Sequence, residues 1–367
     1  MRTRPNRRTR PSPNHHEAST GDRSGRPRSE EPVAARAGRL RSLDALRGLA
    51  IVVMLLAGNP FMREDLPVQL KHPEWHGLRF ADLFFPLFLF VVGIAMTLSR
   101  RTGQPWLVLR RVVLLALLGV ALTSLKHREL VIPGVLQHIA GSYLLAWLVL
   151  RSPRKLQPAL TAGILVGVWV GFLLWAGEGQ DPWSMEDSLA HEVNGWFFGG
   201  FSTEGVLQTV ASSVTVLGGA FVGRLVKDVR DPPLLARRVA VHAAWLIVVA
   251  LLLSIEVPIN KRLWSPSFTL LTLGTSCAWF ALLIWLIDIR RQRWWVTPLH
   301  ELGANPIAVY VGFIAVRALV SGYRDVVPQL APFGSEVGGA MTYALGWVAL
   351  AWFFAHLLYR RGVFLKL

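Results

Sequence analysis

The chain has 367 residues, of which 52% are hydrophobic and only 17% charged, and its mean hydropathy is +0.40. This composition excludes an ordinary water-soluble domain and is typical of a membrane protein. The formal net charge of +16 is then expected to lie in loops and tails that face water.

Residues 1–42 differ in composition from the rest of the chain. They hold eleven Arg against four acidic residues, a net charge of +7, with abundant Pro and Ser and few apolar side chains. Such a segment buries too little apolar surface to fold, so we expect a disordered cytoplasmic arm. It either rests on an anionic membrane surface or stays solvated, and we expect no nucleic-acid binding. It does not resemble a cleavable secretory signal, because a long polar arm precedes an apolar segment of full spanning length.

Ten apolar stretches from residue 43 onward are long enough to cross a membrane as helices, which takes about 20 residues each. They show no period-2 alternation, which favours helices over the strands of a membrane barrel. We therefore predict an all-α polytopic fold over residues 43–367. The predicted spans are 43–60, 80–99, 108–125, 133–150, 158–176, 205–226, 239–257, 267–287, 304–320 and 336–358.

The Lys and Arg residues of the connections alternate in number from one side of the predicted spans to the other. One side, which includes the C-terminal tail, holds 17 of them, and the opposite side holds 8. Positive residues near helix ends tend to remain cytoplasmic. Both termini are therefore predicted to be cytoplasmic, and residues 71–79 to face the exterior or a lumen.

Other motifs are few. The single cysteine, Cys277, lies in a predicted span, excludes an intrachain disulfide and belongs to no CxxC or Cys/His zinc pattern. We see no Walker loop, no GxGxxG after a strand and no GxSxG elbow. We therefore expect no metal, and the sequence does not support ATP hydrolysis or serine hydrolase chemistry.

The stretch KHPEWHGLRFAD, residues 71–82, crowds ionisable side chains against the second predicted span. Asp82 falls in the first turn of that span, where capping and the helix dipole favour an anion. Alternatively, Asp82 or Glu74 fixes the orientation and tautomer of His72. His72 and His76 have the spacing of a metal-binding pair, but Pro73 and the lack of a third ligand argue against a metal.

Six blocks of sequence, between about residues 39 and 315, carry a family resemblance. In order they are RLRSLDALRGLAIVVMLLAGNP, HPEWHGLRFADLFFPLFLFVVG, IPGVLQHIAGSYLLAW, TEGVLQTVASSVTVLGG, PINKRLWSPSFTLLTLG and LGANPIAVYVG. Together they resemble the heparan-alpha-glucosaminide N-acetyltransferase family. The Arg-rich tail and compact loops are in the style of a bacterial protein, so we expect a multipass protein of a bacterial inner membrane.

The resemblance implies a transmembrane acyltransferase domain over residues 43–367. It would move an acetyl group from cytosolic acetyl-CoA to an amino sugar or related glycan beyond the membrane, with a homodimer as the implied assembly. His72 matches the active histidine of the family. His76 stands where the lysosomal members have Asn, and Asn59 is retained in a turn where Gly58 replaces another Asn.

Acyl transfer from a thioester needs a base or nucleophile and a group that stabilises the oxyanion. Imidazole has an unperturbed pKa of about 6.5, so His72 could either take a proton from the acceptor or carry the acetyl group itself. Besides His72 and Asp82 as catalytic residues, we predict two groups of binding residues. For the acceptor and the oxyanion they are Asn59, Glu74, Trp75, His76, Gln137, His138, Lys261, Arg262 and Trp264, and for acetyl-CoA they are Asp44, Arg47, Arg110 and Arg111.

Two other functional classes fit the residues without the resemblance. A transporter could use the same polar cavity, and a structural or lipid-handling protein would use these side chains as interfacial anchors. A transporter should keep its function when His72 cannot do acid–base chemistry but the cavity is intact, whereas an enzyme should not.

Overall fold

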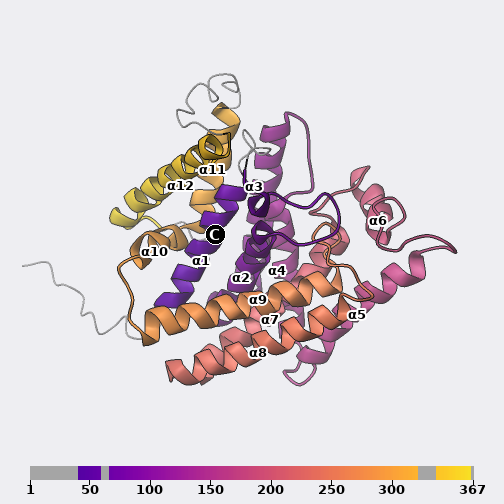
Figure 1. Ribbon diagram of the computed structural model, residues 1–367, viewed down its shortest axis with the longest axis horizontal. Helices are drawn as coiled ribbons and strands as arrows, with labels where there is room; N and C mark the ends of the chain where they lie inside the picture. Colours follow the sequence, from indigo (N-terminus) through magenta and orange to yellow (C-terminus); the bar gives the residue numbers. More distant parts are fainter. Residues whose placement is uncertain (1–39, 59–65, 321–335, 365–367) are drawn as a thin grey trace, which may run out of the picture. The chain divides into compact units, whose positions relative to one another are not determined.

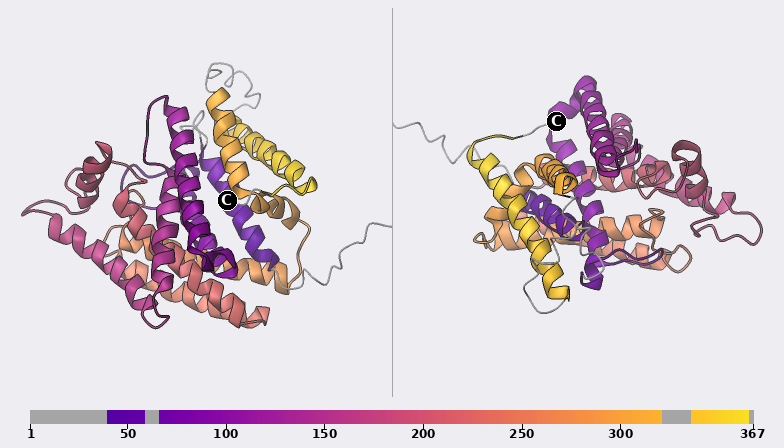
Figure 2. Two further views of the ribbon diagram at one scale, coloured as in Figure 1. Left: turned by 180° about the vertical axis from the view of Figure 1, so that it is seen from behind. Right: turned by 90° about the horizontal axis from the view of Figure 1, so that it is seen from above.

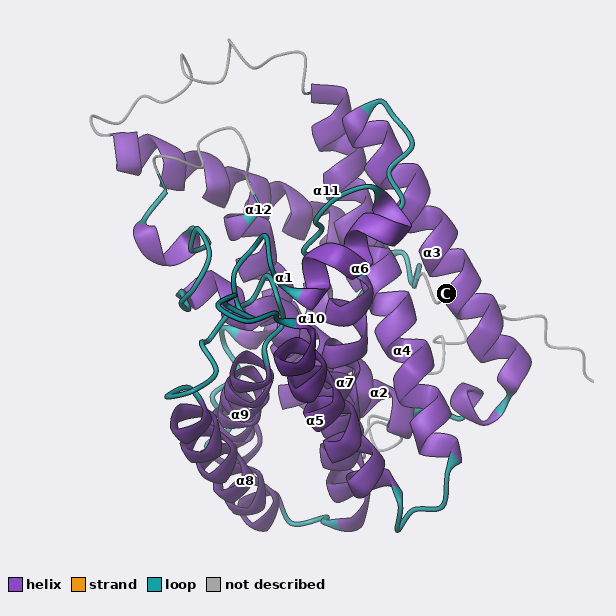
Figure 3. Cartoon of the chain, turned by 90° about the vertical axis from the view of Figure 1, so that its right-hand side faces the viewer, coloured by secondary structure: helices purple, strands orange, loops and turns teal. Residues whose placement is uncertain are grey.

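The computed structural model describes residues 40–58, 66–320 and 336–364. Figure 3 shows helices and loops in these ranges, with no strand among the described residues. They belong to one compact unit that begins at Leu40. The predicted arm, residues 1–42, lies outside the described residues except at its end, where the first helix already begins at Arg41.

Twelve α-helices follow one another along the described residues (Figure 1). They are α1 (Arg41–Ala57), α2 (Phe84–Leu98), α3 (Pro105–His127), α4 (Val135–Arg151), α5 (Gln157–Trp175), α6 (Leu189–Phe198), α7 (Val206–Asp228), α8 (Pro232–Leu253), α9 (Pro266–Leu283), α10 (Val296–Ala304), α11 (Pro306–Val320) and α12 (Glu336–Arg360). A 3₁₀ turn, Phe80–Leu83, leads into α2, and a π-helical turn, Ile284–Ile289, continues α9.

Seven helices of the described residues are long and apolar enough to cross a membrane, or eight if the bent pair α10–α11 counts as one span. Helix α4 is apolar but shorter. The all-α fold of an integral membrane protein is therefore confirmed, whereas ten spans and cytoplasmic termini stay predictions.

The predicted span 304–320 corresponds to α11, and a short helix that was not predicted, α10, precedes it and meets it at 81°. Pro306 begins α11, and a proline cannot continue a preceding helix because it lacks the N–H and disfavours helical geometry in the residue before it. Asn305 accordingly has φ −128° and ψ 52°, outside the helical region. The chain therefore bends at the start of the predicted span, and α10 and α11 are separate helices.

Helix α2 is central to the packing and carries the residues that organise the site. It packs closely against α7 through small residues: a Cβ atom on Gly93 would collide with the backbone of Val216, and one on Gly219 with the backbone of Phe90. Close approach through small residues is the usual packing device of helices in membranes. Helices α8 and α9 run side by side (Figures 1 and 2), and the loop that joins them reaches the N-terminal end of α2.

Candidate functional site

Two loops dock on each other at the N-terminal end of α2. The Gly77 N–H donates to the Ile259 carbonyl at 2.8 Å, and Gly77 has φ 110°, a conformation that favours glycine. Asn260 is buried, and its side-chain oxygen accepts from the Leu263 N–H at 2.9 Å. Its amide nitrogen lies 3.2 Å from Nδ1 of His76. The loop before α9 is thereby fixed against the loop that carries His72.

Asp82 is fully buried and is the centre of this arrangement. Its Oδ1 lies 2.6 Å from Nδ1 of His72 and 3.0 Å from Nζ of Lys261, and its Oδ2 accepts from the Arg79 N–H at 2.9 Å. A carboxylate accepts hydrogen bonds, so it selects the tautomer in which Nδ1 of His72 carries the proton. Nε2 of His72 is then the basic nitrogen. The Arg79 guanidinium donates to the His72 carbonyl at 3.1 Å and fixes the backbone beneath the ring.

Lys261 completes the cluster from the second loop. Its Nζ lies 3.2 Å from Nδ1 and 3.4 Å from Nε2 of His72, and it forms the ion pair with Asp82. The buried carboxylate of Asp82 therefore contacts both the ammonium of Lys261 and the imidazole of His72. The side chains of Lys261 and His72 are each about one quarter exposed.

His72 opens onto a cavity of about 460 Å³, which we call the His72 cavity. It is lined by Val68, Lys71, His72, Pro73, Glu74, Arg79 and Arg262. Three of these side chains are cationic, and the exposed Glu74 is the only acid among the seven. A nucleophilic group that enters this cavity would therefore lie beside the His72 side chain.

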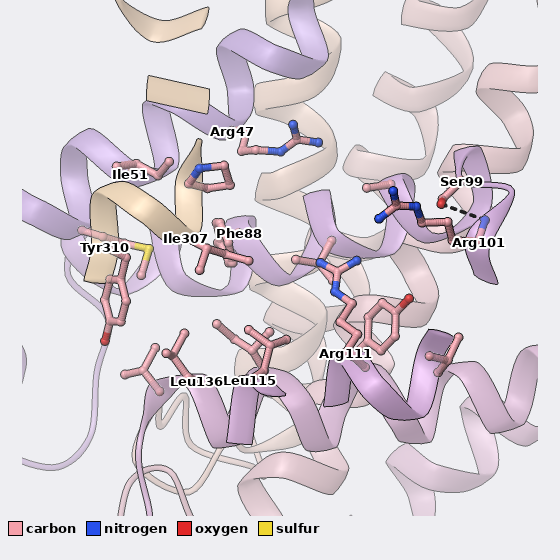
Figure 4. A pocket seen from close by; sticks show the side chains of 18 of the residues that line it. Arg47, Ile51, Phe88, Ser99, Arg101, Arg111, Leu115, Leu136, Ile307 and Tyr310 are labelled. Atoms are coloured by element: carbon pink, nitrogen blue, oxygen red, sulfur yellow. Dashed lines mark hydrogen bonds between the residues drawn. The ribbon is translucent and has the colours of Figure 1, made fainter. Parts of the chain in front are cut away.

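A second cavity, of about 470 Å³, lies among α1, α2, α3, α4 and α11 (Figure 4). We call it the arginine cavity, because Arg47, Arg101, Arg110 and Arg111 line it. The rest of its wall is mainly apolar and includes Phe88, Leu115, Leu136 and Ile307. It therefore combines a cationic region with an apolar region.

Contacts with neighbouring residues orient two of these arginines. Arg47 donates to the Gly303 carbonyl at 3.2 Å and lies 3.5 Å from Asp44. The guanidinium of Arg111 stacks on the ring of Tyr143, 4.8 Å from its centroid. Asp44 thus supports Arg47 but does not line the cavity.

The remaining predicted residues have diverse positions. The Trp75 indole N–H donates to the Trp183 carbonyl at 2.8 Å, and Gln137 donates to the Ile132 carbonyl at 2.8 Å. His138 and Trp264 are buried against each other, with ring centroids 5.0 Å apart. Asn59 lies outside the described residues.

Sequence reasoning missed Asn260 and Tyr143. Asn260 belongs to the PINKRLW block, whose ionisable residues drew attention instead, and a tyrosine within an apolar helix carries no signal of its stacking partner. No group of three or more His, Cys, Asp or Glu is placed to hold a metal ion within the described ranges.

Comparison with known proteins agrees with the six sequence blocks. Residues 39–187 match a family model described as heparan-alpha-glucosaminide N-acetyltransferase, catalytic. The chain is 26% identical to the heparan-alpha-glucosaminide N-acetyltransferases of Mus musculus, over 421 aligned residues, and Homo sapiens, over 422. The chain is thus similar to members of this family over most of its length.

These two alignments cover 90% of this chain, but 61% of the mouse protein and 60% of the human one. The chain therefore spans about three fifths of the length of these curated relatives. The match to the family model includes His72, Asp82, Arg110 and Arg111, and ends before the loop that carries Lys261.

Proposed function

We propose that the chain is a transmembrane acyltransferase that takes an acetyl group from acetyl-CoA bound in the arginine cavity and transfers it to an amino sugar or related glycan in the His72 cavity. The observation that carries the proposal is that α2 and the turn before it connect the carboxylate that orients His72 with the arginine cavity. Asp82, in the turn that leads into α2, orients His72, and Phe88 of α2 lines the arginine cavity. Six residues separate them, roughly 9 Å at about 1.5 Å per residue.

The arginine cavity has the chemistry that coenzyme A requires. Its phosphate groups favour guanidinium partners, because Arg forms charge-assisted hydrogen bonds with phosphate oxygens. The pantetheine arm suits the apolar wall, which follows α2 from Phe88 to Ser99 over roughly 16 Å. A volume of about 470 Å³ lies within the usual range of small-molecule sites. In the predicted orientation, the arginines face the cytoplasm, which contains the acetyl-CoA pool.

His72 supplies the acid–base chemistry. In direct transfer, Nε2 accepts a proton as the acceptor amine attacks the thioester carbonyl, and the C–S bond breaks to release the thiol of coenzyme A. In the covalent route, Nε2 itself forms the bond to the acetyl carbon, the thiol leaves, and the amine then displaces the imidazole. In both routes Asp82 holds the ring and stabilises its protonated form.

The test is acetyl transfer by the purified full-length protein, with acetyl-CoA and glucosamine as probes. We expect thiol release and a product heavier than glucosamine by one acetyl group. His72→Ala should lower the rate by about 10²- to 10⁴-fold, because it removes the general base. His76→Ala is the matched comparison, since His76 lies in the same loop but contacts Asn260 rather than Asp82, and it should lower the rate much less.

A transporter could use the same two cavities. The same experiment distinguishes a transporter from an acyltransferase. A transporter would move its substrate unchanged in mass, and His72→Ala would leave that movement intact. Acetylated product from the wild-type protein and its loss in His72→Ala exclude that alternative. Retention of transfer in His72→Ala together with its loss in His76→Ala would overturn the assignment of His72.

The resemblance also supports a homodimer in a bacterial inner membrane, with a cell-envelope glycan as the natural acceptor. Comparison of the masses of envelope glycans from cells with and without the protein would identify the sugar, since one species should lack an acetyl group in its absence.

A further inference from the structure

Three aromatic side chains pack against one another close to residues of both cavities, and we call them the aromatic layer: Phe85, His138 and Trp264. Their ring centroids are 5.3 Å apart for Phe85 and His138, 5.7 Å for Phe85 and Trp264, and 5.0 Å for His138 and Trp264. Along α2, Phe85 comes one turn after Asp82 and one turn before Phe88.

The neighbours of the layer in sequence line the arginine cavity or contact His72. Leu136 and Ile139, on either side of His138 in α4, line the arginine cavity. Lys261, three residues before Trp264, contacts His72. The layer therefore lies close to the arginine cavity on one side and to the residues around His72 on the other.

The layer holds polar atoms that no described residue satisfies. Both ring nitrogens of His138 and the indole nitrogen of Trp264 are buried and lack a hydrogen-bond partner among the described residues. His138 and Trp264 are each only 1% exposed. Ser142, one turn along α4, bonds instead to the His138 backbone carbonyl and to Ser212. Buried polar groups are normally paired, so three such atoms in one small layer indicate a ligand.

The backbone of Trp264 gives an independent indication. Its φ is 54°, in the left-handed region that a bulky residue rarely adopts. Hydrogen bonds around Asn260 and Ser265 enforce this turn, because the Ser265 N–H donates to the Asn260 carbonyl at 3.0 Å and the Asn260 N–H to the Ser265 hydroxyl at 3.0 Å. Such strain persists only where the surroundings determine it, and it gathers at functional sites. Here it holds the indole inside the layer.

We propose that His138 and Trp264 bind the carbonyl oxygen of the acyl thioester, and so hold the acetyl group in the layer within reach of His72. A neutral imidazole and an indole each offer one N–H donor, and a carbonyl oxygen has two lone pairs to accept from both. As the carbonyl is attacked, its oxygen gains negative charge, and the same two donors stabilise it. This inference rests on the proposed function, and it adds the two residues that hold the reacting carbonyl.

Other ligands fit the layer less well. A metal ion would need more than one imidazole, and no carboxylate or thiolate belongs to the layer. A phosphate would carry charge into apolar surroundings where two neutral donors do not compensate it. A carbonyl is a neutral acceptor and matches two neutral donors.

The test compares the binding of acetyl-CoA and of CoA to the purified full-length protein by calorimetry. The wild type should bind acetyl-CoA about tenfold more tightly than CoA, because only acetyl-CoA offers the carbonyl. His138→Phe keeps an aromatic ring in the layer but removes both nitrogens. It should abolish this preference, leave CoA affinity unchanged and slow transfer by about 10²- to 10³-fold.

Three further variants complete the design. Trp264→Phe removes the indole donor and should act in the same direction, and His138→Gln keeps an N–H donor and should restore part of the preference. His191→Phe is the matched control, because His191 also has a buried Nδ1 without a partner among the described residues, stacks on Phe201, and belongs to α6. It should change neither binding nor transfer.

Each possible result of these measurements supports the inference or contradicts it. If folded His138→Phe and Trp264→Phe keep both the acetyl preference and the transfer rate, the inference is wrong and the proposed function stands. If they lose CoA affinity as well, the layer is structural and the inference is also wrong. If His138→Phe does not fold, His138→Gln and Trp264→Phe decide by the same criteria. A wild type that neither binds acetyl-CoA nor transfers acetyl overturns the proposed function and the inference with it.

Discussion

Asp82→Asn is the sharpest perturbation of the site, because it removes a charge while nearly preserving shape. The substitution leaves Lys261 without its carboxylate and allows the amide to present an N–H₂ group to Nδ1 of His72, which favours the wrong tautomer. We expect acetyl transfer to fall by about 10²- to 10⁴-fold, as when a catalytic histidine loses its orienting carboxylate.

The effect on stability should be much smaller. Disruption of a fully buried ion pair costs about 3–5 kcal/mol, but His72 and Lys261 keep 28% and 22% of their side-chain surfaces exposed, so water solvates them when Asp82 is replaced. Asn can still accept from the Arg79 N–H. We therefore expect a loss of about 1–3 kcal/mol in the free energy of unfolding.

The assay pairs transfer kinetics with acetyl-CoA affinity and thermal unfolding. Acetyl-CoA affinity should stay near the wild-type value, because Asp82 does not line the arginine cavity. Glu74→Gln is the comparison, since this exposed acid lines the His72 cavity and was the alternative partner of His72; its effect should be below about tenfold. Near wild-type transfer by a folded Asp82→Asn protein would refute the role given to this carboxylate.

Three further predictions follow from other parts of the structure. Arg111→Gln should weaken acetyl-CoA binding by about 10- to 100-fold through loss of a charge-assisted phosphate contact, with little change in the rate at saturation; calorimetry that finds unaltered affinity would argue against phosphates at this arginine. Gly93→Ala should lower the free energy of unfolding by about 1–3 kcal/mol, because the added methyl collides with the Val216 backbone; an unchanged denaturation midpoint would contradict the packing of α2 on α7. His76→Cys should be labelled by an impermeant maleimide from the exterior only, against a low background because Cys277 is buried, and labelling from the cytoplasmic side alone would reverse the predicted orientation.

Helix α5 was predictable from the sequence almost to the residue, because a continuous apolar run of spanning length is bounded by polar residues: the prediction was 158–176 and the helix is Gln157–Trp175. Helix α6 was not predicted, since its ten residues are too short for the length criterion. Helix α10 was not predicted for the same reason, since it has only nine residues.

In the candidate site, too, some contacts could be predicted from the sequence and others could not. His72 and Asp82 are ten residues apart, so local spacing could suggest their contact. Lys261 is 189 residues from His72, and its contact with the same carboxylate depends on how α8 and α9 pack, which no local pattern encodes. The arginine cavity likewise needs Arg47 of α1 beside Arg111 of α3, an arrangement that appears only when the helices are assembled.

Stability alone does not explain the buried Asp82. Removal of a carboxylate from water costs several kcal/mol, and its attraction to Lys261 and His72 offsets this cost only in part, so apolar side chains at these positions would serve the fold at least as well. Capping of the helix does not explain these contacts either. As a cap, Asp82 needs only the hydrogen bond that its Oδ2 accepts from the Arg79 N–H, and not the contacts with Lys261 and His72. What Asp82 adds is the orientation of the imidazole of His72, which lines a cavity, one helical turn from an aromatic layer whose donors have no partner among the described residues. That combination is the physical reason for proposing that the N-terminal end of α2 is a catalytic centre for transfer between the two cavities.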